Sequence, residues 1–329
     1  MARLIVEQAG PLTTIQDAGR FGHLRYGVTW SGPVEPFGFA AAQAAMGAYG
    51  PAIELSHGGI TLRCTEGSVR FALAGGDFAA TLDGQTLGCW TSGVLVPGAR
   101  LVIRDGVMGN WATLAFDGAI DCPTWLGSAA TLALAGFGGG RLVAGDTLTV
   151  AARPVGDTAP YSLAPPPSAA GPIRVVLGPQ LDFFTAETVA VLLGAPFTAA
   201  LAFDRMGMVL DGPPLLPLSV TMLSSPVIRG AVQVNGAGAA TILLADHQTT
   251  AGYPRIATVI SADLPRAAQL RPGQALRFAA VEAGEAVAIA RRAAAARTAW
   301  LAGLRGGGSL AERLLVTNLI DGVIDAGAS

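Results

Sequence analysis

Short hydrophobic runs, separated by turn residues, recur along most of the chain. Residues 69–74 (VRFALA) alternate with a period of two and end at a Gly-Gly pair, which is typical of a strand with one face in a core. Residues 80–82 lead into Asp83-Gly84, a strong signal for a tight hairpin turn. Comparable runs occur at 101–104, 241–245, 257–260 and 276–281. The pattern predicts a mainly β protein built from many short strands.

A few segments have helical spacing instead. Apolar residues recur every three or four positions in 36–46, and Gly47 can end that helix. The Ala- and Arg-rich segment 285–304 predicts a second helix. Residues 188–203 are apolar and uncharged, but Gly, Ala and Pro interrupt them, and they are shorter than the ~20 residues of a membrane-spanning helix. We therefore expect a helix, a turn and a strand there, and no contact with a membrane.

A Pro-rich segment divides the chain into two halves. Six prolines within residues 152–172 are incompatible with a helix or the interior of a strand. The expected organisation is an N-terminal β-rich lobe at 1–151, a linker at 152–172, a second β-rich lobe at 173–283, and a helix and tail at 284–329. A Gly-rich break is expected within the tail, at 306–309. The fold class is therefore mainly β with a few helices, in two β-rich lobes.

Composition excludes several kinds of chemistry. All 21 basic residues are Arg, so Schiff-base lysine catalysis, a Walker A loop and a biotinylated lysine on this chain are ruled out. The net charge of −2, without a basic stripe, argues against a nucleic-acid partner. The three Cys and three His lack the spacing of disulfide or metal sites, so no bound metal is expected. No secretory signal opens the chain, and a cytoplasmic location is expected.

Three polar clusters fall among turns, where binding groups commonly lie. Residues 13–20 combine hydroxyls, an amide, a carboxylate and a guanidinium, which suits an anion or amide site; the simpler interpretation is a polar turn with Asp17 paired to Arg20. In 204–207, Arg205 could bind a carboxylate or phosphate, or form an ion pair with Asp204. Residues 246–253 follow a buried strand and form either a cleft wall or a capped turn.

Taken together, these motifs resemble one family over nearly the whole chain. In chain order they are 10–20 (GPLTTIQDAGR), 31–32 (SG), 73–77 (LAGGD), 82–84 (LDG), 204–207 (DRMG), 230–234 (GAVQV), 244–254 (LADHQTTAGYP) and 318–323 (NLIDGV). They are similar to the subunit of prokaryotic 5-oxoprolinase that is designated C, also called allophanate hydrolase subunit 2, KipA or the biotin-dependent carboxyltransferase family. The resemblance implies a cyclophilin-like β-barrel architecture.

The resemblance also implies an activity and partners. The expected function is that of a subunit of an ATP-dependent amide hydrolase, which opens the lactam of 5-oxoproline, or a related small cyclic amide, and is active only with its partners. Those partners are a KipI-like protein, the subunit designated B, in a hetero-oligomer and a LamB/YcsF-type subunit. ATP is expected at or with the partner subunit, and biotin is not required.

Two alternatives stay open. One is the carboxyltransferase subunit of a biotin-dependent urea or amide carboxylase. The other is a KipA-like regulatory protein that antagonises a KipI-type kinase inhibitor without catalysis. The sequence departs from the family pattern at charged positions: the usual Arg of a Gly-Ser-Arg turn is replaced by Ala129, and Ser225-Pro226 replaces a Glu-Gly pair. These departures leave the substrate open.

Candidate site residues follow from the resemblance and from the polar clusters. Asp246, Arg205 and Asp17 are the catalytic candidates: an aspartate as general base, and Arg205 for a substrate carboxylate or acyl-phosphate. The candidates for substrate binding are Gln16, Arg20, Ser31, Glu54, His57, Asp204, Gln233, Gln248, Thr249 and Tyr253. Among them, Gln233, Gln248 and Thr249 are expected to hold the edge of a lactam or ureido group.

Overall fold

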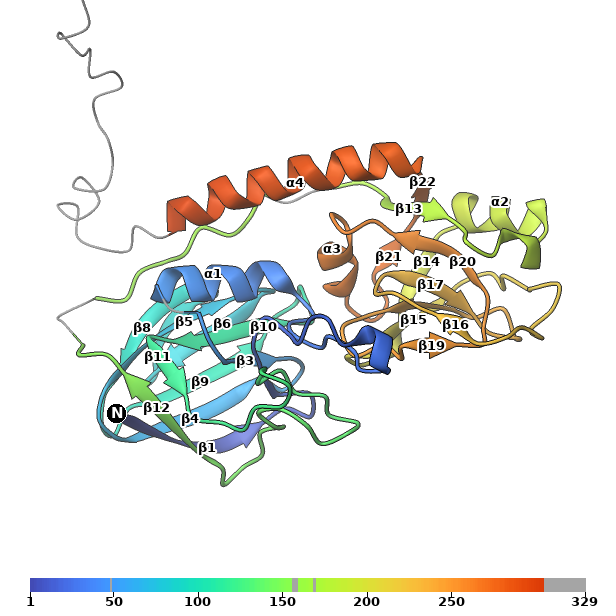
Figure 1. Ribbon diagram of the computed structural model, residues 1–329. Helices are drawn as coiled ribbons and strands as arrows, with labels where there is room; N and C mark the ends of the chain where they lie inside the picture. Colours follow the sequence, from blue (N-terminus) through green and yellow to red (C-terminus); the bar gives the residue numbers. More distant parts are fainter. Residues whose placement is uncertain (48, 156–158, 168–169, 305–329) are drawn as a thin grey trace, which may run out of the picture.

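The chain folds into two β-rich lobes that lie side by side, with one long helix across both (Figure 1). The computed structural model describes residues 1–47, 49–155, 159–167 and 170–304. The Gly-rich break expected at 306–309 and the motif at 318–323 lie outside the described residues. The prediction of a mainly β fold with a few helices is confirmed.

Two antiparallel sheets form the first lobe. The larger has seven strands in the order β11-β12-β1-β4-β9-β6-β7, and the smaller has five in the order β2-β3-β10-β5-β8. The larger sheet comprises β1 (Ala2–Ala9), β4 (Ile60–Glu66), β6 (Phe78–Leu82), β7 (Gln85–Gly88), β9 (Arg100–Asp105), β11 (Gly118–Ile120) and β12 (Thr147–Ala152). The smaller comprises β2 (Thr14–Gln16), β3 (Ala52–Leu55), β5 (Val69–Ala74), β8 (Thr91–Leu95) and β10 (Ala112–Phe116).

The alternation along β5 places its side chains in two separate cores. Phe71 and Leu73 enter the core shared by the two sheets, whereas Ala72 and Ala74 face α1 (Pro36–Met46). Small alanines on this face let the helix approach the sheet closely. The helix predicted at 36–46 is therefore confirmed, and so is the hairpin at Asp83-Gly84, where both residues have positive φ, 49° and 85°.

The second lobe is a closed barrel. Its eight-stranded sheet runs β21-β14-β15-β18-β17-β20-β13-β22, and only Arg277 separates the first and last strands, β21 (Ala275–Leu276) and β22 (Phe278–Ala280), in the chain. One extended segment thus pairs with β14 on one side and β13 on the other, which closes the sheet on itself. The other strands are β13 (Ile173–Leu177), β14 (Phe197–Phe203), β15 (Gly207–Asp211), β17 (Ala231–Val234), β18 (Ala240–Leu243) and β20 (Arg255–Val259).

Small elements complete the two lobes. These are α2 (Ala186–Gly194), α3 (Leu264–Ala268), the paired strands β16 (Ser225–Pro226) and β19 (Thr250–Ala251), and the 3-10 turns η1 (Leu24–Tyr26), in the first lobe, and η2 (Leu181–Phe183). The helix, turn and strand expected over 188–203 are present as α2 and β14. Between β12 and β13, the described residues contain only an isolated bridge, from Ser162 to Thr91.

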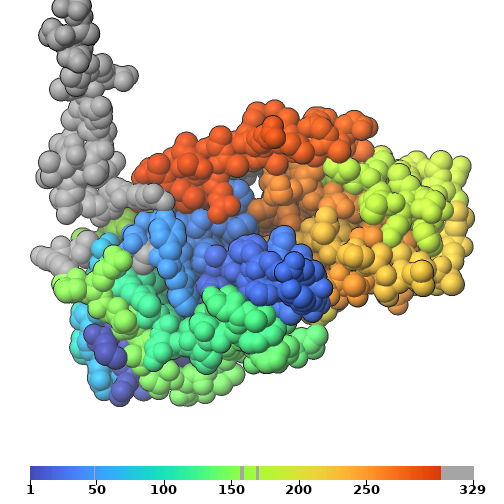
Figure 2. Space-filling view, in the orientation of Figure 1, coloured from blue at the N-terminus to red at the C-terminus, as the bar shows by residue number. Residues whose placement is uncertain are grey.

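The helix expected at 285–304 is α4 (Ala283–Leu304), which leaves the barrel and crosses to the first lobe (Figures 1 and 2). Its far end packs Trp300 and Leu304 against the apolar cluster of α1, and Arg297 lies over the ring of Phe37. The helix therefore ties the two lobes together along one side. No helix among the described residues is long and apolar enough to cross a membrane.

Candidate functional site

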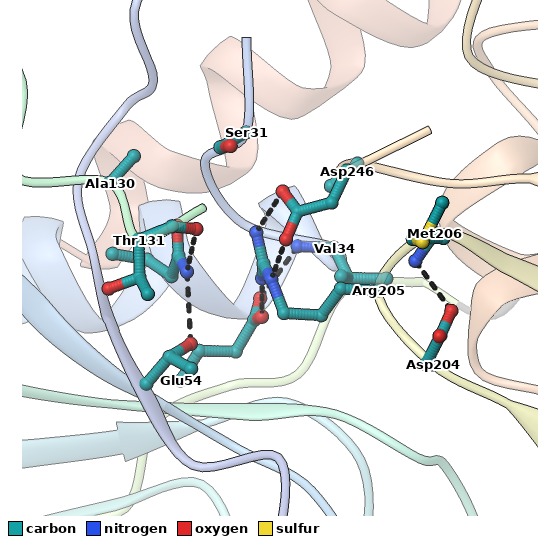
Figure 3. A network of polar contacts seen from close by, with 12 residues as sticks. Ser31, Val34, Glu54, Ala130, Thr131, Asp204, Arg205, Met206 and Asp246 are labelled. Atoms are coloured by element: carbon teal, nitrogen blue, oxygen red, sulfur yellow. Dashed lines mark hydrogen bonds and ion pairs between the residues drawn. The ribbon is translucent and has the colours of Figure 1, made fainter. Parts of the chain in front are cut away.

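The two lobes meet at a buried arginine. Arg205, in the turn between β14 and β15, donates from Nε and Nη2 to the two carboxylate oxygens of Asp246, at 2.8 and 3.0 Å. Its Nη1 donates to Glu54 of β3, and Nη2 also donates to the carbonyl of Gly32 at 2.7 Å (Figure 3). These contacts occupy four of the five guanidinium N–H groups.

Burial and charge together determine the electrostatics of this junction. The side chain of Arg205 is 4% exposed, and burial alone would lower its pKa, but the carboxylates of Asp246 and Glu54 outweigh that effect and raise it. Burial raises the pKa of Glu54, against the opposing charge of Arg205 and a hydrogen bond of 2.6 Å from the Val34 backbone N–H. A ligand could reach Arg205 only by displacing one of its carboxylates.

Two further arginines of the second lobe donate to carbonyls of the first. Arg229 Nη1 donates to Pro33 at 3.1 Å, and Arg271 Nη1 donates to the carbonyl of Gly106. Burial lowers the pKa of Arg229 to about 10. Together with Arg205, these side chains hold the segments around 32–34 and 106 of the first lobe against the barrel.

Glu35 lies at the edge of the same junction and caps α1. Its carboxylate accepts hydrogen bonds from the N–H groups of Phe37 and Gly38, at 2.7 and 2.6 Å. Burial raises the pKa of Glu35 to about 7, against the lowering effect of those two hydrogen bonds. The carboxyl of Glu35 therefore exchanges its proton near neutral pH.

An open cavity of about 500 Å³ lies on the outer face of the barrel. Along β15, β17 and β18, alternate residues such as Met208, Val232 and Ile242 enter the core, so the residues between them face outward. The cavity is lined by Ala202, Phe203, Asp204, Met206, Gly207, Val209, Gln233, Asn235, Thr241, Leu243, Gln248 and Tyr253. Four of the candidate binding residues, Asp204, Gln233, Gln248 and Tyr253, therefore share one cavity.

Two side-chain amides meet in this cavity. Gln248 Nε2 donates to Gln233 Oε1 at 3.1 Å. Gln233 is 6% exposed, and its Nε2 is buried without a hydrogen-bond partner among the described residues. A buried donor without a partner costs about 1–3 kcal/mol, so this atom is suited to an acceptor on a ligand.

Asp204 lies at the rim of the same cavity. Its Oδ1 accepts from the backbone N–H groups of Met206 and Gly207, at 2.7 and 3.1 Å, which fixes the carboxylate in the turn that follows β14. In Figure 3 the Asp204 carboxylate lies beside Met206, away from the Arg205 guanidinium, and Arg205 forms no ion pair with Asp204. The interpretation of Arg205 as an ion-pair residue holds, but with Glu54 and Asp246 as partners.

The polar cluster at 13–20 lies outside the lining of this cavity, and its charged side chains bond to other segments of the first lobe, while Thr13 Oγ1, Gln16 Oε1 and Arg20 Nε are buried without a partner among the described residues. Asp17 accepts from Ser128 Oγ and the Ala129 N–H, both at 2.6 Å. Arg20 donates to Ser31 Oγ at 3.1 Å and to the carbonyl of Ala130, and it lies over the ring of Trp125. The simpler interpretation of this cluster, a polar turn, predicted an ion pair between Asp17 and Arg20. That ion pair is absent among the described residues. Gln16 Nε2 bonds to Thr14 and Thr131.

His57 and Thr249 lie outside the cavity lining. His57 Nδ1 is 3.0 Å from Asp105 Oδ2, and its ring packs edge-on against Phe203. Although burial acts to raise it, hydrogen bonds from His57 and Arg271 lower the pKa of Asp105 to about 2. Thr249 follows Gln248 and accepts, through its carbonyl, from the Val227 N–H at 3.1 Å.

Sequence reasoning missed two polar residues of the cavity lining, Thr241 of β18 and Asn235, which follows β17. Thr241 and Asn235 carry no motif, and the signal that could have identified Thr241 is the alternation along β18, where Ile242 faces the core. Asn110 and Trp111, which are not among the candidate residues, join the lobes: both N–H groups donate to Gln269 Oε1, at 2.7 and 2.8 Å.

Comparison with known proteins agrees with this architecture. The family described as carboxyltransferase domain, subdomain A and B, matches residues 26–280. The chain is 33% identical over 285 residues to the 5-oxoprolinase subunit of Haemophilus influenzae that is designated C, covering 85% of this chain and 91% of that protein.

Two solved structures are also similar. The crystal structure of TTHA0988 has a TM-score of 0.75 at 33% identity, covering 85% of this chain. The crystal structure of the Kluyveromyces lactis urea amidolyase has a TM-score of 0.79 at 25% identity, covering 91% of this chain. This chain spans 55% and 20% of the length of these two proteins. The chain therefore belongs to the carboxyltransferase-domain family, subdomain A and B, and is a homologue of the 5-oxoprolinase subunit that is designated C.

Proposed function

We propose that this chain is a subunit of an ATP-dependent complex that opens the lactam of 5-oxoproline or a related small cyclic amide, and that the cavity on the barrel binds the amide. The observation that carries this proposal is the pair Gln233 and Gln248. Their mutual hydrogen bond uses one donor and one acceptor, which leaves Gln233 Nε2 and Gln248 Oε1 for a ligand. A lactam edge offers the complementary acceptor and donor, its carbonyl and its N–H.

The same pair suits the chemistry of opening an amide. Attack on a lactam carbonyl places negative charge on its oxygen, and a donor fixed in advance stabilises that charge. The side chain of Gln233, on β17, is nearly buried, so its amide has little freedom to move. The cavity lining carries no Arg, Lys or His among the described residues. A polyphosphate would lack a cation there, which supports binding of ATP at the partner subunit.

The rim of the cavity suits a partner protein. Leu201, Val220 and Leu223 are exposed, and Leu223 is 91% exposed. Leu201 precedes Ala202 and Phe203, which line the cavity. Val220 lies close to Gly236, and Ser224, which follows Leu223, lies close to Gly252; both glycines are next in sequence to lining residues. Exposed apolar side chains around an open site are typical of a protein interface. We propose that the KipI-like protein covers this rim, with the LamB/YcsF-type protein as third subunit.

Reconstitution tests this function. The purified chain is combined with a KipI-like protein and a LamB/YcsF-type protein, and ADP release and glutamate formation are followed with 5-oxoproline. Both products should appear together and only when all three proteins are present. The variant Gln233→Leu should lose most of the turnover, whereas Gln85→Leu, on the exposed strand β7, should keep it. A complex that assembles but consumes ATP with no small lactam contradicts the proposal.

The likeness to a urea amidolyase supports a second candidate, transfer of a carboxyl group to urea or a similar amide. The relevant observation is the TM-score of 0.79 over 91% of this chain. Since the chain contains no Lys, the biotin carrier would be another protein. Avidin distinguishes the two functions, because it should block carboxyl transfer and leave lactam opening unchanged.

A further inference from the structure

One carboxylate dominates the charge of the barrel cavity. Of the twelve residues that line it, Asp204 is the only one of the types Asp, Glu, Arg, Lys and His. Its Oδ1 is held by two backbone N–H groups, and its Oδ2 accepts no hydrogen bond within the described part of the chain. The carboxylate therefore has a fixed position at the rim.

No nearby cation offsets this charge inside the cavity. Arg205 is next in sequence, but its guanidinium points into the lobe junction, where Glu54 and Asp246 hold it (Figure 3). The remaining polar groups of the lining are neutral: the amides of Gln233, Asn235 and Gln248, and the hydroxyls of Thr241 and Tyr253. An anionic ligand in this cavity therefore meets a like charge and no counterion.

We propose that Asp204 is a specificity residue that makes this cavity select an uncharged small amide, with a free C=O and N–H, over one that carries a carboxylate. The inference rests on the proposed function and narrows its substrate class. The neutral lactam or ureido edge is held by the pair Gln233 and Gln248, and Asp204 disfavours an acidic substituent beside it. The carboxylate of 5-oxoproline is accommodated only if a partner protein supplies a cation.

Ligand-observed NMR titration of the full chain tests this selection. The probes are 2-pyrrolidinone, which is neutral, and 5-oxoproline, which has the same ring with a carboxylate. In the unchanged protein, 2-pyrrolidinone should bind more tightly. In Asp204→Asn, which keeps the Oδ1 acceptor of the turn, 5-oxoproline should gain roughly five- to tenfold in affinity, the effect of one like charge a few ångströms away in a hydrated site. The affinity for 2-pyrrolidinone should change much less than that for 5-oxoproline, because this probe carries no charge.

The control is Asp211→Asn, which changes the net charge equally on β15 but at an exposed residue outside the cavity lining. It should leave both affinities unchanged. The preference for 2-pyrrolidinone should also decrease as salt is raised from about 0.01 to about 0.5 M, because the like charges are screened. The proposal is overturned if 5-oxoproline binds at least as tightly as 2-pyrrolidinone, if 2-pyrrolidinone does not bind, or if Asp204→Asn behaves like Asp211→Asn.

This outcome is separable from that of the proposed function. Loss of ATP-dependent lactam opening by the complete complex contradicts the function, while the binding preference of the single chain can still hold. Conversely, a complex that opens 5-oxoproline with equal efficiency before and after Asp204→Asn, together with equal binding of the two probes, contradicts the selection and leaves the function intact.

Discussion

Arg205 and Glu54 form an ion pair that joins the two lobes, and the side chains are only 4% and 2% exposed. They are 151 positions apart in the sequence. Asp246 completes the group, so one guanidinium pairs with two buried carboxylates. Removal of one member of such a buried pair leaves an uncompensated charge, which is costly.

Replacement of Arg205 by Met should therefore lower the free energy of unfolding by about 3–5 kcal/mol, because Glu54 and Asp246 would be left buried without their cation. Urea unfolding followed by circular dichroism measures this. The matched control is Arg3→Met, which breaks the exposed pair with Glu66 and should cost less than about 1 kcal/mol. Equal losses in the two variants would contradict the role of the buried Arg205 in stabilising the junction of the two lobes.

Local patterns were enough to predict the parts of the fold that depend on neighbouring residues. The alternation at 69–74 and the Asp83-Gly84 turn specify β5 and the hairpin of β6 and β7, and the spacing in 36–46 specifies α1. Closure of the barrel was beyond such patterns. The barrel closes because residues 275–280 pair with both β14 and β13. Hydrophobic periodicity and turn residues predict a strand, but they do not identify the strand with which it pairs.

The site was predictable to a similar degree. Motifs identified Gln233 and Gln248, but only the barrel brings these residues, 15 positions apart, into one hydrogen bond. Arg205 was identified as a charged residue with a partner. Its partners, Glu54 and Asp246, were not identified. Glu54 lies in the other lobe, and an ion pair between lobes leaves no local signal in the sequence. Thr241 was missed because an outward-facing strand residue looks ordinary in sequence.

The pKa of Glu35, raised to about 7 by burial, implies a pH-dependent stability. Between about pH 4.5 and 7, the Glu35 carboxyl keeps its proton in the folded state, whereas in the unfolded state, with an ordinary pKa near 4.5, it has lost the proton. The contribution of Glu35 to the free energy of unfolding is therefore fully present below pH 4.5. It decreases as the pH rises to about 7, by roughly 3 kcal/mol in total.

Glu35→Gln should remove that dependence, since an amide does not titrate. Urea unfolding at intervals between about pH 4.5 and 7.5 measures the slope for the variant and the unchanged protein. Glu66→Gln, at an exposed position, is the control and should leave the slope as it is. If Glu35→Gln and the unchanged protein show parallel curves over this range, Glu35 does not carry the buried proton.

Gln233→Leu should weaken amide binding and leave the fold intact. The variant removes the donor that has no partner among the described residues, so stability should change by less than about 1 kcal/mol, while the affinity for 2-pyrrolidinone falls roughly tenfold, the effect of one lost hydrogen bond. Ligand-observed NMR measures the affinity, with Gln85→Leu as the control on the exposed strand β7. Unchanged affinity would place the amide elsewhere.

Leu223→Glu tests the rim as the surface that the KipI-like protein covers. Leu223 is 91% exposed, so a charge there should leave the free chain stable but should weaken association, because the carboxylate loses its water when the partner binds. Analytical ultracentrifugation of the chain with the KipI-like protein should show at least a tenfold increase in Kd, which corresponds to about 1.4 kcal/mol. Leu134→Glu is the matched control, because Leu134 is 85% exposed but lies in the first lobe. This variant should bind the KipI-like protein as tightly as the unchanged chain does. If the two variants bind the KipI-like protein equally well, that protein covers another face.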